Sequence, residues 1–208
     1  MIFEDFNRTY CRSENVWDEM FSQEGVREHY ALFLNGLKQM GKEELANRNE
    51  LAKKLFMTQG ITFTVYDNGE GIEKIFPFDV IPRIVSADEF AYLDKGIGQR
   101  IFALNLFLED IYSEQKILKD GIIPSEFVFS SKAFLPEFMN TPVSKNIRVH
   151  ISGIDLVKNS VGDGWVVLED NLRVPSGVSY PLSLRMLTRK VFPEFFEKLP
   201  IATVTDYP

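Results

Sequence analysis

The chain has 208 residues, of which 45% are hydrophobic and 25% are charged, a composition typical of globular domains. Its 23 basic and 30 acidic residues give a net charge of −7, which argues against a general nucleic-acid-binding surface because such a surface needs a basic patch. The single cysteine, Cys11, excludes an internal disulfide, and without a bilayer-spanning apolar run or a secretory signal we expect a cytoplasmic protein and no membrane partner.

The first quarter of the chain has a helical pattern. Residues 13–21 predict a short helix that starts at Ser13. Apolar residues then recur at helical spacing over Val26–Met40 and over Lys42–Met57, and Gly41 separates the two segments. We therefore expect residues 1–57 to form a helical N-terminal extension and residues 58–208 to form the main domain.

The next segment predicts a hairpin and an extended connection. Ile61–Tyr66 and Ile72–Phe76 have the alternation of strands, and the residues between them are turn formers. Pro77 and Pro82 then exclude a central strand because proline cannot donate a backbone hydrogen bond. Arg83 follows directly; it is either an ordinary surface arginine or one that rigid backbone holds ready for an anion.

Two helices are predicted after this connection. Ser86 and Glu89 have the spacing of a capping box that opens a short helix, and two glycines, Gly96 and Gly98, are expected to end it. Gln99–Tyr112 gives the clearest helical pattern of the chain.

Two polar residues in this second helix need partners. Arg100 lies near the expected start, where the helix dipole disfavours a cation, so it should face an anion or an acidic neighbour. Asn105 lies beside the apolar stripe and is either a satisfied core residue or a contact of a site.

The stretch from Arg148 to Asn171 predicts a second hairpin. Arg148–Val157 alternates polar and apolar residues, and a turn around Val161 and Gly162 should join it to Trp165–Leu168, whose continuous apolar run indicates a strand buried on both faces. We expect an α/β (α+β) fold in which this hairpin is central in a mixed sheet and the Gln99–Tyr112 helix packs on it. The side chains expected to be largely buried there are Leu104, Leu108, Trp165 and Val167.

Oxygen-bearing side chains gather on this hairpin. Folding about the predicted turn places Asp155 opposite Leu168 or Glu169, and Glu169 and Asn171 point to the same side because they are two residues apart. Two carboxylates and an amide are suitable ligands for Mg²⁺, which takes oxygen ligands and bridges to phosphates. The alternative is that these carboxylates are simply solvated at the end of a strand.

The sequence around these residues resembles a known family, the circularly permuted ATP-grasp proteins of type 2, which are relatives of glutathionylspermidine synthase. In ATP-grasp ligases a hairpin carries an aspartate on its first strand and Glu-x-Asn on its second, before a loop of proline, serine and glycine. At Gly153 the chain differs from the glutathionylspermidine synthase branch, which has an arginine two residues before the metal aspartate. The resembling segments are GITFTVY at Gly60–Tyr66, PFDVIPRIV at Pro77–Val85, QRIFALNLFLEDIY at Gln99–Tyr112, GIDLV at Gly153–Val157 and VLEDNLRVPSGVSY at Val167–Tyr180.

This resemblance implies a partial ATP-grasp fold, with residues 58–208 as the N-terminal half of the permuted domain. The implied cofactors are ATP and Mg²⁺, with Asp155, Glu169 and Asn171 as metal ligands. Ser176 and Gly177 would contact the substrate or the transferred phosphoryl group. The remaining candidates, all for binding anions, are the catalytic arginines Arg83 and Arg173 and the cofactor-binding Arg100.

The implied activity is that of a carboxylate–amine ligase, which activates a small-molecule carboxylate as an acyl phosphate and joins it to an amine. Relatives continue beyond this segment and supply the ATP-binding lysines, so we expect the isolated chain to be inactive without the remaining half of the domain. The alternative is a truncated, non-catalytic ATP-grasp-like module for binding or assembly. The sequence leaves the substrates open, and a homo-oligomer remains an option.

Overall fold

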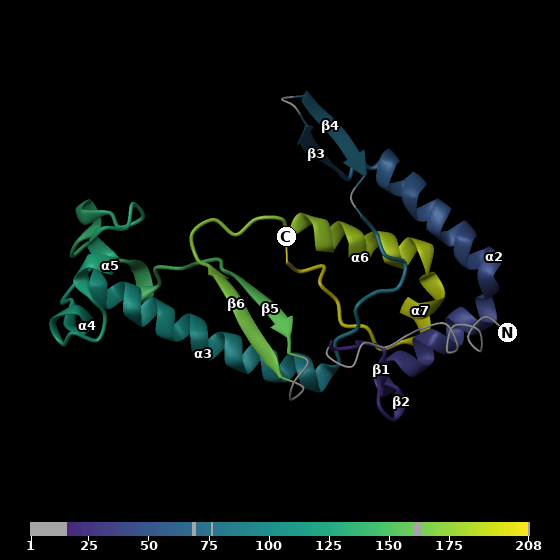
Figure 1. Cartoon of the computed structure of the whole chain (residues 1–208), viewed down its shortest axis with the longest axis horizontal. Coiled ribbons are helices and arrows are strands. Elements are labelled where there is room, and N and C mark those ends of the chain that lie inside the picture. The colour runs from purple at the N-terminus through teal and green to yellow at the C-terminus, as the bar shows by residue number, and fades with distance from the viewer. Residues whose placement is uncertain (1–15, 68–69, 76, 160–163, 208) are drawn as a thin grey trace. The chain divides into compact units, whose positions relative to one another are not determined.

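The computed structural model describes residues 16–67, 70–75, 77–159 and 164–207 (Figure 1). Helices and short antiparallel strand pairs make up the regular structure. The elements in chain order are β1 (Phe21–Ser22), β2 (Gly25–Val26), α2 (Glu28–Thr58), β3 (Thr62–Asp67), β4 (Glu70–Ile75), α3 (Ala87–Ile111), α4 (Lys116–Lys119), α5 (Ser125–Phe129), the 3₁₀ turns η1 (Pro136–Phe138) and η2 (Ser144–Asn146), β5 (Gly153–Lys158), β6 (Trp165–Asn171), α6 (Ser179–Val191) and α7 (Pro193–Lys198).

These elements form two compact units. The first takes the described residues of segments 1–86 and 177–208, and the second takes those of segments 87–158 and 164–176. The chain therefore leaves the first unit after β4, builds the second, and returns to the first before α6. Some predicted features lie outside the described residues, namely Cys11, the helix start at Ser13, Phe76 and the turn around Val161 and Gly162.

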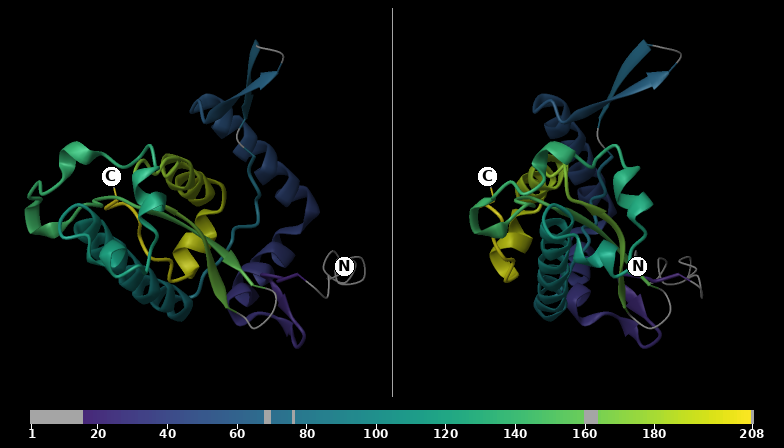
Figure 2. Two further views of the ribbon diagram at one scale, coloured as in Figure 1. Left: turned by 60° about the vertical axis from the view of Figure 1, so that its left-hand side comes forward. Right: turned by 90° about the vertical axis from the view of Figure 1, so that its left-hand side faces the viewer.

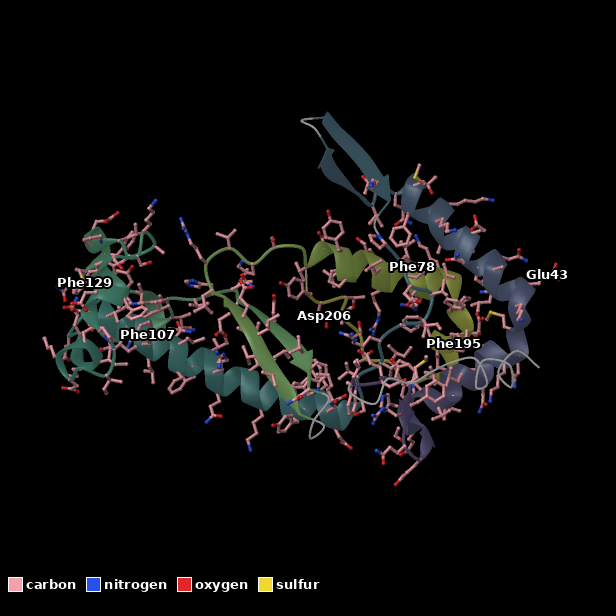
Figure 3. The ribbon with its side chains drawn as sticks, viewed as in Figure 1. Glu43, Phe78, Phe107, Phe129, Phe195 and Asp206 are labelled. Carbon is pink, nitrogen blue, oxygen red and sulfur yellow. The ribbon has the colours of Figure 1, made fainter. Side chains whose placement is uncertain are left out.

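The first unit has an aromatic core between α2, α6 and α7. The rings of Phe33 and Phe195 are tilted by 45° with 4.6 Å between their centroids, and Phe192 packs beside Phe195 at 5.6 Å (Figure 3 labels Phe195). Gly36 makes this contact possible, because a Cβ there would lie 2.8 Å from Cζ of Phe195 and closer still to its Cε1. The buried members of the core are Tyr30, Phe33, Leu34, Leu37, Ala52, Val191, Phe192 and Phe195.

Tyr30 ties the proline-rich connection to this core. Its hydroxyl accepts a hydrogen bond from the backbone N–H of Ile84 at 2.9 Å and donates one to the carbonyl of Pro82 at 3.2 Å. Burial raises the pKa of the Tyr30 phenol above its ordinary value of 10.0, because the interior disfavours the phenolate. This contact fixes the backbone on both sides of Arg83.

Several predictions for the first unit are confirmed. The two N-terminal helical segments are the two halves of α2, and Gly41 separates them with φ 82° and ψ 171°. The first predicted hairpin is β3–β4, paired from Thr62–Ile75 to Asp67–Glu70. The prediction of a short helix over residues 13–21 is wrong for residues 16–21, which the structure describes. There the Asp18 carboxylate accepts hydrogen bonds from the backbone N–H groups of Met20 and Phe21, and the chain forms a turn instead.

The second unit is built along α3, which corrects one prediction. The sequence predicted two helices divided by Gly96 and Gly98, whereas Ala87–Ile111 is one continuous helix. Neither glycine has a positive φ, so neither ends the helix. A glycine in a helix interior costs only about 1 kcal/mol relative to alanine, and the strong apolar pattern after Gly98 outweighs that cost.

The second predicted hairpin is β5–β6, but it is not central in a mixed sheet. It forms a two-stranded antiparallel sheet by itself, and each strand in the described residues pairs only with its neighbour in sequence. Pro175 and the loop around it leave the strand geometry directly after β6, so no further strand follows on that side. The hairpin lies along α3 in Figures 1 and 2.

Burial in the second unit is partial. Leu104, Leu108, Trp165 and Val167, which were expected to be largely buried, are mostly covered, although none of them is fully buried. A single helix under a two-stranded sheet covers only one side of each element, and this explains the partial burial.

Candidate functional site

The residues of the predicted metal site lie on β5 and β6. Asp155 pairs directly with Glu169, and Gly153 pairs with Asn171. Paired residues in an antiparallel sheet point to the same face, as do residues two apart on a strand. Asp155, Glu169 and Asn171 therefore share one face of the hairpin. Directly opposite residues have Cβ atoms only about 4.5–5.5 Å apart, a spacing at which two carboxylates can share a cation.

A β-bulge at Leu168 creates this arrangement. Asp155 pairs with Glu169, whereas the next residue, Leu156, pairs with Val167, so Leu168 is an extra residue in β6. If the same sequence paired without a bulge, Leu168 would lie opposite Asp155, Glu169 would turn to the opposite face, and Asp170 would take the face of Asp155. The bulge thus brings Glu-x-Asn to the face that carries Asp155.

The bulge also corrects the prediction for Trp165–Leu168. The continuous apolar run indicated a strand buried on both faces, but Val166 is 45% exposed and Leu168 is 69% exposed. Only Trp165 and Val167 turn toward α3, and both are half-buried. The run is continuous because the inserted Leu168 interrupts the alternation, not because both faces are covered.

The opposite face of the hairpin is attached to α3 by polar contacts. Near the start of α3, Glu89 accepts hydrogen bonds from the cross-strand pair Lys158 and Trp165, the latter at 2.8 Å from the indole nitrogen. Further along α3, Arg100 binds Asp170 with two hydrogen bonds, Nε to Oδ1 at 2.7 Å and Nη2 to Oδ2 at 2.5 Å.

Asn105 and Glu109 hold the segment that leads into β5. The Asn105 amide oxygen accepts the backbone N–H groups of Arg148 and Val149 at 2.8 and 3.0 Å, and its NH₂ donates to the carbonyl of Ile101 at 3.1 Å. The Arg148 side chain donates to Glu109 at 2.8 Å. Of the two interpretations of Asn105, the satisfied structural residue is therefore the one observed.

The sequence predicted that Arg100 faces either an anion or an acidic neighbour. The structure shows the acidic neighbour, because Arg100 forms an ion pair with Asp170. The hydrogen bonds from Arg100 lower the pKa of Asp170 below its ordinary value of 3.8, and the same contact raises the pKa of Arg100. The pair therefore persists through mildly acidic pH, since Asp170 must be protonated below that value before it is lost.

The two candidate carboxylates have no such partner. Within the described residues, neither Asp155 nor Glu169 forms an ion pair or a side-chain hydrogen bond, and both are exposed. No group of three or more His, Cys, Asp or Glu side chains in the described part of the chain is placed to hold a metal ion. A site here would consist of two carboxylates, one amide and water or phosphate oxygens.

The other candidates lie before and after the hairpin. Arg173 and Ser176 are exposed in the loop after β6, and Gly177 has a φ of +83° just before α6 begins at Ser179. Gly177 belongs to the first unit, as does Arg83, which pairs with Glu19 at 2.5 Å and is 66% exposed. The structure brings Asp155, Glu169 and Asn171 together, and it joins Arg100 to their hairpin through Asp170.

Gly153 lets the loop after β6 fold back over the hairpin. A Cβ on Gly153 would lie 3.1 Å from the Cβ of Pro175 and 3.6 Å from the Cβ of Asn171. A side chain here would displace the loop, so this chain has no room for the arginine that stands at this position in the resembling branch.

We predict that Gly153→Ala destabilises the protein by up to about 1 kcal/mol, since Pro175 must move by a few tenths of an ångström. Gly98→Ala is the matched control, because nothing lies within 4 Å of its Cβ and it should stabilise α3 by about 0.5–1 kcal/mol. Urea denaturation of both variants measures the difference. Equal shifts in the same direction would show that the contact of Gly153 with Pro175 is unimportant.

Comparison with known proteins identifies the fold family. The family described as circularly permuted ATP-grasp type 2 matches residues 82–208, which include the hairpin and the whole of α3. The chain belongs to this family. The resemblance drawn from the sequence is therefore confirmed, and the helices and small antiparallel sheets are consistent with an α+β ATP-grasp-type fold.

Similar proteins occur in several bacteria. An uncharacterised protein of Synechocystis sp. is 43% identical over 93% of this chain, which corresponds to 40% of that protein. An uncharacterised protein of Mycobacterium leprae is 40% identical over 99% of this chain and 36% of its own length. A Frankia alni protein, provisionally named glutamate–cysteine ligase 2-3, is 41% identical over 86% of this chain and 20% of its own length. The chain thus spans 40% or less of these relatives.

The structure adds residues that sequence reasoning missed in this ATP-grasp chain. Asp170 lies between Glu169 and Asn171 in the sequence but points to the other face of β6 and binds Arg100. Glu89 was assigned only to a capping box, although it holds the other end of the hairpin. The expectation that Arg100 faces an acidic neighbour is confirmed, but its ground is wrong, because α3 begins at Ala87 and Arg100 lies in the interior of the helix rather than near its start.

One groove lies apart from these residues, in the first unit. It has a volume of about 670 Å³ between α2 and the extended segment after β4, where Figure 3 labels Phe78. Its lining residues are Lys42, Leu45, Ala46, Asn49, Pro77, Phe78, Asp79 and Val80. None of the predicted site residues contributes to it.

Among the helices that the structure describes, none is both long and apolar enough to cross a membrane.

Proposed function

We propose that this chain provides the Mg²⁺–ATP-binding hairpin of an ATP-dependent carboxylate–amine ligase, of which it forms the N-terminal part. The observation that supports this proposal is the register of β5 and β6, which puts Asp155, Glu169 and Asn171 on one face of the hairpin, with both carboxylates exposed and Asn171 half-buried. Membership of the ATP-grasp family makes ATP the cofactor to test.

The chemistry of these three side chains suits Mg²⁺. This ion prefers oxygen ligands, keeps several waters, and is usually held by one or two carboxylates together with phosphate oxygens. Neither carboxylate forms an ion pair with a cation among the described residues, so both are available to an incoming ion. Bound there with ATP, Mg²⁺ would neutralise charge that develops on the β- and γ-phosphates.

Other residues receive supporting roles in the proposal. Arg173 makes no ion pair within the described residues and is free to bind an anionic group near the hairpin, such as the transferred phosphoryl group. Ser176 would donate its hydroxyl to the same oxygens, and Gly177 would let the backbone approach them. Arg83 is a weaker candidate, because it already pairs with Glu19.

The proposed reaction joins a small-molecule carboxylate to an amine in two steps. A carboxylate oxygen attacks the γ-phosphorus of ATP and releases ADP, and the amine then attacks the acyl carbon and releases phosphate. The provisional ligase names of two Frankia proteins support the reaction class, but the chain covers only 20% of each of them and so does not fix the substrates. The partner of this hairpin would be the remaining half of the ATP-grasp domain.

The deciding experiment compares the 208-residue chain with the same chain joined to the downstream half of a full-length relative. Metal affinity from two carboxylates and an amide is weak without phosphates that are themselves held by further cations. We therefore predict that the isolated chain shows neither tight MgATP binding by calorimetry nor ADP release, and that the joined protein shows both. ATP turnover by the chain alone would contradict the assignment, and inactivity of the joined protein would favour the non-catalytic binding or assembly module.

A further inference from the structure

Glu169 and Asn171 flank Asp170 in sequence, and the three side chains alternate between the faces of β6. Asp170 turns toward α3 and is 21% exposed, whereas Glu169 is exposed on the other side. Fixing the side chain of Asp170 therefore fixes the rotation of β6 about its own axis, and with it the direction in which its two neighbours point.

The contact that fixes Asp170 is geometrically demanding. Arg100 binds both carboxylate oxygens at once, through Nε at 2.7 Å and Nη2 at 2.5 Å. A planar guanidinium that meets a carboxylate with two parallel hydrogen bonds restricts orientation as well as distance. A single charge contact would restrain the direction of the Asp170 side chain less.

The position of this contact along β6 is also informative. Bulged strands bend and twist more readily than regular ones, so the bulge at Leu168 is where the direction of Glu169 is most easily lost. The hairpin is held to α3 on both sides of the bulge, by Glu89 at Trp165 and by Arg100 at Asp170.

The spacing of the two attachments is similar on helix and strand. Glu89 and Arg100 are eleven residues apart, which is about three helical turns and about 16 Å at ~1.5 Å per residue, so they share one face of α3. Trp165 and Asp170 pair with Lys158 and Ile154, which are four residues apart because Leu168 is an extra residue, so they are about 13 Å apart at ~3.3 Å per residue. The helix thus presents its two partners at an interval close to that of the strand, and the long Arg100 side chain can cover the difference.

We propose that Arg100 is a positioning residue, which acts through Asp170 to hold Glu169 and Asn171 on the cation-binding face of the hairpin. The metal role of these two residues rests on the proposed function, but the ordering of β6 does not. Arg100 itself is not a phosphate ligand in this proposal, because Asp170 occupies two of its donors and neutralises its charge.

A charge argument and a positioning argument predict opposite effects on metal binding. If Arg100 acts only through its positive charge, its removal should strengthen cation binding, because a cation near the site is lost and Asp170 becomes an unpaired carboxylate. Removing a positioning contact should weaken cation binding. The sign of the change in Mn²⁺ affinity in Arg100→Gln therefore separates the two.

The test uses the protein encoded by the complete reading frame, with Arg100→Gln and the matched control Glu89→Gln, which alters the other attachment on the same helix. Hydrogen exchange is measured without metal at the amides of residues 165–167 and 169–171. Mn²⁺ binding is measured by electron paramagnetic resonance with and without ATP. Thermal unfolding of each variant reports global stability.

We expect Arg100→Gln to speed exchange at residues 169–171 roughly threefold to fivefold, as suits the loss of an exposed ion pair, and to weaken Mn²⁺ binding by a similar factor. Glu89→Gln should instead speed exchange at residues 165–167. The proposal is overturned if Arg100→Gln leaves residues 169–171 unchanged, if both variants loosen both segments alike, or if Mn²⁺ binds more tightly. If Mn²⁺ binding in the unmodified protein does not depend on Glu169, the proposed function fails, while hydrogen exchange still decides whether Arg100 orders β6.

Discussion

Replacing Glu169 with glutamine is expected to lower ATP-dependent ADP release by about a hundredfold or more in the protein joined to its downstream half. Glutamine keeps the size of the side chain and one oxygen but removes the charge that Mg²⁺ requires. Changing residues that merely orient a metal ligand commonly costs about 10–100-fold in affinity or activity, so loss of a charged ligand should reach or exceed that range. The rate is measured at saturating ATP over a range of Mg²⁺ concentrations.

Two further variants make this result specific. Asp155→Asn should have an effect of the same order, because Asp155 is the cross-strand partner of Glu169. Glu126→Gln is the matched control, since Glu126 is an exposed carboxylate in α5 of the same unit and should leave the rate unchanged. A Glu169→Gln variant that behaves like Glu126→Gln would remove the hairpin from the proposed ATP site.

The largest effect on stability is expected in the first unit, at Phe195. This ring is 6% exposed and packs against Phe33 and Phe192, so Phe195→Ala should cost about 3–5 kcal/mol in the free energy of unfolding. Gly36→Ala should also destabilise the protein, because the new methyl group meets the Phe195 ring. Overpacking of this kind costs about 1–3 kcal/mol. The higher helix propensity of alanine offsets up to about 1 kcal/mol of that cost.

The double variant tests this contact directly. Once Phe195 is alanine, the methyl group at position 36 has room, and Gly36→Ala should become neutral or stabilising by up to about 1 kcal/mol. The two substitutions are thus expected to be non-additive, with the coupling measured by urea denaturation of all four proteins. Additive effects would show that the ring and the α2 backbone are not in contact.

The sequence predicted those features that depend on local pattern. Gly41 divides the N-terminal helix, and the strands expected at Ile61–Tyr66 and Ile72–Phe76 pair as β3 and β4. Both follow from a period of 3.6 or 2 residues or from a turn signal within a short window. The pattern left Asp155 opposite Leu168 or Glu169, and the bulge places Glu169 there. The family resemblance rested on longer strings of residues and was confirmed by the match over residues 82–208.

The failures concern features that depend on contacts between distant segments. Gly96 and Gly98 looked like helix breakers, but a glycine ends a helix only where a positive φ is adopted, and α3 does not adopt one. The apolar run at Trp165 could not reveal that one of its residues was an insertion. The partner of Arg100 lies 70 residues away in sequence, so a local pattern could indicate the need for an acid but not its identity.

The bulge at Leu168 has a consequence for how relatives of this protein should be compared and engineered. Leu168 is a residue that the hairpin accommodates without changing which side chains lie opposite each other. If it were deleted, Val167 and Glu169 would be neighbours in a regular strand, and Glu169 would still pair with Asp155. A relative that is one residue shorter between the tryptophan and the glutamate can therefore present the same carboxylates, and an alignment with it should place the gap at Leu168.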